Sequence, residues 1–132
     1  MMRKTVLIYN FPEGEEEKLR RLAGGSARVL PVQPLHYGIP LSELLDENRK
    51  DRGKAERSKE VFGERMMVFG GFEEENFDGF LSALREAKIG IGALKAVLTP
   101  TNALWTSEDL YRELAKEREA FFRLREGQKP WR

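Results

Sequence analysis

The chain has 132 residues, of which 40% are apolar and 34% charged, so it is long enough for one hydrophobic core and short for two. Its 23 basic and 22 acidic residues nearly cancel, which argues against a whole-molecule attraction to nucleic acid or to an anionic membrane. It contains no cysteine, which excludes disulfides, thiolate metal sites and cysteine nucleophiles and suits a reducing compartment. We expect a single cytoplasmic domain over residues 1–132, with no membrane association.

The first part of the chain predicts a strand, a helix and a second strand. Residues 5–9 are β-branched, apolar and aromatic, as is typical of a strand. Residues 13–23 begin with glutamates, continue with basic residues and end at Gly24-Gly25, which is the charge order and the stop signal of a helix. Residues 27–32 predict the second strand. Pro31 places this strand at an edge or bend, because proline cannot donate a hydrogen bond within a sheet.

The middle of the chain predicts little regular structure. Three leucines between residues 41 and 48, after Pro40, indicate a short helix. Residues 49–64 include few apolar side chains and more bases than acids. Burying so little apolar surface would not offset the conformational entropy lost when the segment becomes ordered. We expect this stretch to be a flexible charged insert or an isolated, solvent-exposed helix.

The last part of the chain repeats the strand–helix–strand pattern and adds a helix. Residues 66–69 and 94–98 predict strands, and residues 73–88 between them have the apolar spacing of an amphipathic helix. Thr106, followed three residues later by an acid, resembles a capping box. It predicts a helix from there to about residue 125.

Two βαβ halves of this kind can form two sheets. One is an open four-stranded parallel α/β sheet, order 2-1-3-4, with helices on both faces. The other is a ferredoxin-like βαββαβ sheet with an added C-terminal helix. The runs Val6–Tyr9 and Met66–Phe69 are apolar without alternation, which indicates strands covered on both faces and favours the parallel sheet.

The segments Leu7–Phe11, Met67–Phe72 and Leu94–Asn102, with Trp105–Thr106, resemble a prokaryotic family of domains of unknown function, DUF3783. The resemblance covers most of the chain and is most specific over Lys95–Trp105. It implies no catalytic residue, cofactor or substrate.

Polar residues and glycines follow the predicted strands and form a candidate ligand site. In a parallel sheet the carboxyl ends of the strands meet at one edge, where open α/β sheets bind their ligands. Asparagine and threonine can orient a polar ligand, and glycine allows close approach, although turn formation explains each residue type equally well. The candidate residues are Asn10, Gly70, Gly71, Thr99, Thr101, Asn102 and Trp105. Since nucleotide-binding and metal-ligand spacings are missing from the sequence, we expect neither a cofactor nor a metal.

These features favour a non-catalytic ligand-binding or protein-interaction domain, with an unknown small molecule or protein as its partner. A small enzyme acting on a polar molecule, with His36 or a carboxylate moving protons, is one alternative. An RNA-binding sheet displaying Tyr9 and Phe69 is another, although nucleic acid has the weaker support. Phe121-Phe122 extend the apolar content of the last helix beyond one stripe, which suits either a homodimer or packing on the same domain.

Overall fold

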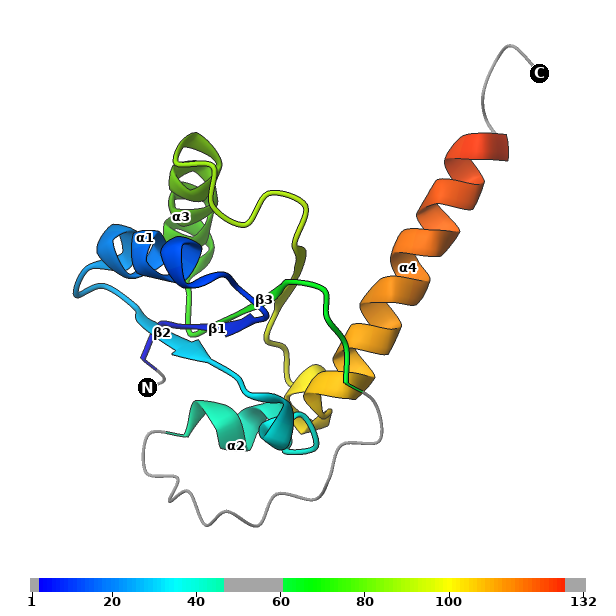
Figure 1. Ribbon diagram of the computed structural model, residues 1–132, viewed down its shortest axis with the longest axis horizontal. Coiled ribbons are helices and arrows are strands. Elements are labelled where there is room, and N and C mark those ends of the chain that lie inside the picture. Colours follow the sequence, from blue (N-terminus) through cyan, green and yellow to red (C-terminus); the bar gives the residue numbers. More distant parts are fainter. Residues whose placement is uncertain (1–2, 47–60, 128–132) are drawn as a thin grey trace.

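The computed structural model describes residues 3–46 and 61–127, and of residues 124–127 it describes the backbone alone. The described part folds into a four-stranded sheet with helices on both faces (Figure 1). The elements in chain order are β1 (Thr5–Tyr9), α1 (Glu13–Ala23), β2 (Arg28–Pro31), η1 (Pro34–His36), α2 (Leu41–Leu45), β3 (Met66–Gly70), α3 (Glu74–Glu86), β4 (Leu94–Val97), η2 (Asn102–Leu104) and α4 (Ser107–Gly127).

The sheet has the strand order β2-β1-β3-β4 and consists of two βαβ units. In each unit a helix connects two neighbouring parallel strands: α1 connects β1 to β2, and α3 connects β3 to β4. The units meet at the centre of the sheet, where β1 and β3 pair antiparallel. The sheet is therefore mixed, with one antiparallel joint between two parallel halves.

The α/β class, the strand order and the helices on both faces are confirmed, but the expectation of a fully parallel sheet is wrong at its centre. Thr5 pairs with Gly70 and Tyr9 pairs with Met66, so β1 and β3 run in opposite directions. The ferredoxin-like alternative would place β4 beside β1, whereas β4 lies beside β3. The continuous apolar runs indicate that both faces of β1 and β3 are covered. They do not indicate whether a neighbouring strand runs parallel or antiparallel.

Alternate residues of the central strands supply two separate cores. Ile8 and its neighbours on the same face pack under α1 and α3, where Leu19 and Leu84 are fully buried. Leu7 and the residues of its face pack against α2 and the base of α4. Figure 1 shows α1 and α3 on one side of the sheet and α2 on the other.

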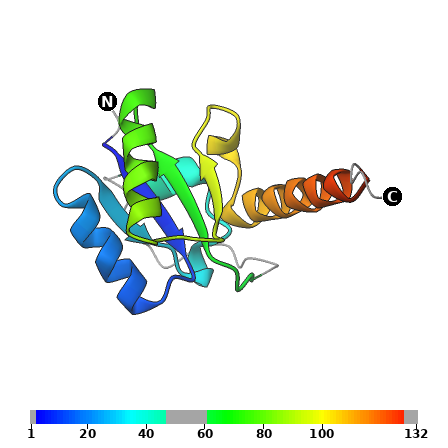
Figure 2. The same ribbon diagram turned by 90° about the horizontal axis from the view of Figure 1, so that it is seen from above.

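Helix α4 is packed on the domain at its base and then leaves it. Leu110 is buried, and Tyr111 and Leu114 pack against the core beside the sheet. Beyond these residues the helix projects away from the sheet and the other helices (Figures 1 and 2). Among the described residues, no helix combines the length and apolar character needed to cross a membrane.

The predicted insert is described only at its end. Residues 49–60 lie outside the described residues, whereas residues 61–64 are described. Phe62 is 7% exposed and stacks between Tyr37 and Tyr111, with ring centroids 4.6 and 4.2 Å away. The end of the insert therefore contributes to the core, a role its composition did not predict.

Candidate functional site

The antiparallel joint separates the residues that were predicted to share one crevice. Gly70 lies opposite Thr5, at the start of β1, whereas Asn10 follows the other end of β1. Thr99 lies near Gly70, because the amide of Leu98 donates to the carbonyl of Phe69. The candidate residues thus divide between opposite ends of the sheet.

Asn10 connects β1 to the segment that precedes β3. Its backbone has a φ of 62°, a left-handed conformation that asparagine tolerates better than most residues. Its Nδ2 donates to the carbonyl oxygens of Phe62 and Glu64, both at 2.9 Å, and the hydroxyl of Tyr37 lies 3.5 Å from its Oδ1. The amide therefore fastens one backbone segment to another.

At the opposite end of the sheet, Thr99 and Asn102 form a closed turn. The amide of Thr99 donates to Oδ1 of Asn102 at 2.8 Å, and the amide of Asn102 donates to Oγ1 of Thr99 at 3.0 Å. Nδ2 of Asn102 donates to the carbonyl of Val97. Asn102 is buried and uses its polar atoms within the turn, while Thr101 beside it is exposed. This arrangement is that of a strand-to-helix connection rather than a ligand cradle.

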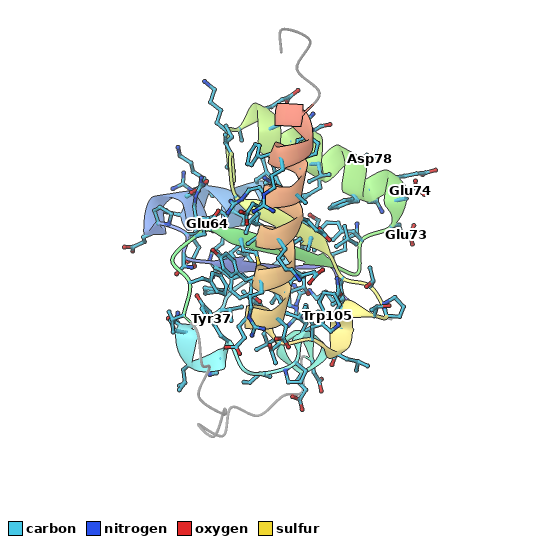
Figure 3. All side chains as sticks on the ribbon, turned by 90° about the vertical axis from the view of Figure 1, so that its right-hand side faces the viewer. Tyr37, Glu64, Glu73, Glu74, Asp78 and Trp105 are labelled. Carbon is cyan, nitrogen blue, oxygen red and sulfur yellow. The ribbon has the colours of Figure 1, made fainter. Side chains whose placement is uncertain are left out.

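Acidic residues follow the glycine pair at the end of β3. Glu73, Glu74 and Asp78 stand out from the start of α3 (Figure 3), and all three are exposed. Carboxylates suit a helix N-terminus, but they repel the anionic ligands that such a position would otherwise attract. Gly70 and Gly71 therefore lie in a poor setting for a phosphate.

Two buried tyrosine hydroxyls also lie between the sheet and α4. Tyr9 and Ser107 share a hydrogen bond of 2.7 Å, and Tyr37 lies beside them. Burial raises the pKa of both tyrosines above the ordinary value. Both phenols therefore stay protonated at neutral pH and act here as hydrogen-bonding groups of the core.

Glu64 joins the segment before β3 to α4. Its carboxylate pairs with Arg118 and accepts a hydrogen bond of 3.0 Å from the hydroxyl of Tyr111. The hydrogen bond from Arg118 is the main cause that lowers the pKa of Glu64. These contacts fasten α4 to the segment that precedes β3.

Trp105 lies at the base of α4 and is partly buried against the core. Its carbonyl accepts a hydrogen bond of 2.8 Å from the amide of Leu41, which links α2 to the start of α4. The indole also borders a shallow depression of about 300 Å³. The rest of its lining comes from one face of α4 and mixes charges: Asp109, Arg112, Glu113 and Lys116. A shallow depression with balanced charge selects no particular class of small molecule.

The distal end of α4, which we define as residues 119–123, exposes two large aromatic side chains. Phe121 is 56% exposed and Phe122 is 52% exposed, with their ring centroids 6.3 Å apart. Leu114 and Arg118 lie one to two helical turns earlier on the side of α4 that faces the domain, and Phe121 and Phe122 continue that side. The apolar stripe therefore runs past the part of the domain that covers it.

The described residues offer little support for RNA binding, for catalysis by His36 or for a metal site. Tyr9 and Phe69 are buried, so neither can stack on a nucleic acid base. His36 lies in η1, on a short turn next to Tyr37. Within residues 3–46 and 61–127, histidines and carboxylates form no cluster of three that could hold a metal ion.

The second half of the chain is similar to a known family of domains. Residues 65–121 match the family described as Domain of unknown function (DUF3783). This segment contains Lys95–Trp105 and extends from β3 to Phe121, so the resemblance inferred from the sequence is confirmed over the second βαβ unit and most of α4. No curated protein sequence and no solved structure matches the chain.

Proposed function

We propose that the chain is a non-catalytic protein-interaction domain of the cytoplasm and that the distal end of α4 is its contact surface. The observation that supports this proposal is the exposure of Phe121 and Phe122 on the side of α4 that is buried closer to the domain. Aromatic side chains on a rigid element are typical centres of protein interfaces.

The energetics of a projecting helix favour a covered state. Short helices without tertiary contacts are marginally stable in water, and the distal end of α4 extends beyond the domain (Figure 2). Burying a phenylalanine side chain contributes about 1.5–3 kcal/mol. A partner that covers Phe121 and Phe122 would stabilise both the helix and the complex.

Ligand binding at the strand ends has less support than protein binding. The side chains of Asn10 and Asn102 hold backbone groups of this chain, and a ligand would have to displace those hydrogen bonds. The same two residues would have oriented the substrate in the enzyme hypothesis.

Site-specific photo-crosslinking in cells tests the proposal. A photo-reactive phenylalanine analogue at position 122 should give covalent adducts with protein, and Phe121→Ser should reduce them. The same analogue at position 104 is the matched control, because Leu104 is an apolar residue that is 76% exposed but lies outside α4. Equal adducts at both positions, or none at position 122, would contradict an interface at the distal end of α4.

A further inference from the structure

We infer that the partner of the distal end of α4 is a second copy of the same chain, with the two α4 helices antiparallel and centred near Phe121. This inference rests on the proposed function and names its partner. It also accounts for the order of charges along the helix, which a general apolar contact would leave unexplained.

The charges around Phe121 are arranged with opposite signs on its two sides. Glu117 lies about one helical turn before Phe121 and Arg125 about one turn after it, so both positions are on the same side of the helix as Phe121. An antiparallel pair centred near Phe121 places Glu117 of one copy level with Arg125 of the other. A parallel pair would place acids level with acids and bases level with bases, which is unfavourable.

Arg118, which lies between Glu117 and Phe121, already forms an ion pair within its own domain. It pairs with Glu64, so it enters a contact as half of a neutral pair rather than as an additional cation. Arg123 and Glu119 pair along the helix at 2.8 Å, but their side chains are 78% and 67% exposed. Each lies two residues from Phe121 and therefore on the opposite side of the helix, so this pair stays outside the contact.

In a two-fold symmetric dimer, the same short surface of each copy packs against that of the other. A two-fold axis near Phe121 brings the same aromatic side chains of both copies together, so each copy supplies the apolar surface that the other lacks. The contact is limited to a few helical turns, which places it among small interfaces. We therefore expect reversible association with a Kd in the micromolar range, roughly 1–100 µM.

Sedimentation velocity of the purified full chain over a concentration series tests the partner. The unmodified chain should pass from monomer to dimer, and Phe121→Ser with Phe122→Ser should weaken association at least about tenfold, the effect of losing central aromatic contacts. Leu104→Ser, another exposed apolar position, should leave association unchanged. Because Phe121, Phe122 and Leu104 are exposed in the single chain, both variants should melt like the unmodified chain at concentrations below the Kd. A chain that stays monomeric at several hundred micromolar, well above the range expected for small interfaces, would overturn the inference.

Single-cysteine variants test the orientation, because the chain has no cysteine of its own. Phe121→Cys should form a disulfide-linked dimer on mild oxidation, since the two Cα atoms would lie close to the axis. Glu117→Cys is the matched control: its two copies would be about 12 Å apart along the helices and should not link, given a rise of 1.5 Å per residue. Efficient linkage of Glu117→Cys to itself would indicate parallel helices and overturn the antiparallel arrangement. A monomeric chain that still gives photo-adducts with another protein at position 122 would refute self-association alone, and lack of both would refute the proposed function as well.

Discussion

Several polar side chains of this domain act as connections between segments that are far apart in the sequence. Asn10 and Glu64 are the main examples, because one fastens the segment before β3 to β1 and the other fastens it to α4. The sequence identified Asn10 as a candidate ligand-binding residue. An asparagine that follows a strand can either orient a ligand or donate hydrogen bonds to the backbone of another segment, and the sequence does not distinguish these roles. The partners that decide between these roles lie more than fifty residues away and leave no local pattern.

The connection made by Asn10 predicts an order of stability among substitutions at this position. Asn10→Ala removes the two hydrogen bonds and places alanine at a positive φ, so we expect a loss of about 2–3 kcal/mol in the free energy of unfolding. Asn10→Gly also removes the bonds but accepts the backbone conformation, so it should cost about 1 kcal/mol less. Denaturant melts of the two variants measure the difference. Equal losses would show that the backbone conformation relaxes in the alanine variant.

The carboxylate of Glu64 predicts a pH dependence of stability. Its pKa is lowered from 4.5 in the folded state, chiefly by Arg118, so its stabilising contribution is complete above about pH 4.5 and is lost as the pH falls through the lowered value. Glu64→Gln should therefore lower the melting temperature at neutral pH, and the difference from the unmodified chain should shrink below about pH 4.5. Glu73→Gln, at an exposed position at the start of α3, is the control. A difference that stays constant from neutral to acidic pH would contradict this role.

At the scale of elements, the sequence predicted most of the structure. The first strand and helix have the predicted bounds, and the other strands and long helices differ from prediction by one or two residues at their ends. These elements carry their information locally, in apolar spacing, charge order and turn residues. The two short helices η1 and η2 were not predicted, because a single turn of three residues is too short to show a period.

The loop between α3 and β4 predicts different costs for two similar glycines. Gly90 and Gly92 both have positive φ, at 73° and 79°. A Cβ at Gly90 would lie 2.7 Å from Sδ of Met67, a fully buried side chain, whereas a Cβ at Gly92 would meet nothing closer than 3.8 Å. Gly92→Ala should therefore cost about 1 kcal/mol for its backbone alone, and Gly90→Ala at least about 1 kcal/mol more. Similar losses in denaturant melts would mean that Met67 repacks without penalty.

At the scale of the whole molecule, the candidate site could not be predicted because it depended on the direction of one pair of strands. With β1 and β3 parallel, Asn10 and Gly70 would have met, whereas the antiparallel pairing sends them to opposite ends of the sheet. Strand direction is set by how the two units pack, which apolar runs alone do not specify. The exposed face of α4 was predicted as an alternative, but its position beyond the domain required the structure (Figure 1).

Self-association also predicts a change in local stability with concentration. Between about 1 and 500 µM, a range that spans a micromolar Kd, backbone amides of residues 119–123 should become more protected from hydrogen exchange. Amides of β1, at the centre of the sheet, should change less, because they are protected within each copy. Exchange at the distal end of α4 that does not depend on concentration would argue against a covered helix.

The antiparallel joint between the two βαβ units also has a consequence for the order of folding. Within the units, Thr5 pairs with Arg28 and Met66 pairs with Leu94, whereas across the joint Thr5 pairs with Gly70, more than twice as far along the chain. Closing a longer loop costs more conformational entropy, and non-local pairing slows folding. We therefore expect the pairing of β1 with β3 to form in the rate-limiting step, so that a substitution at Val68 slows folding while one at Leu19 mainly speeds unfolding. The strand pair that separates the predicted ligand residues would then also be the nucleus through which the two halves become one domain.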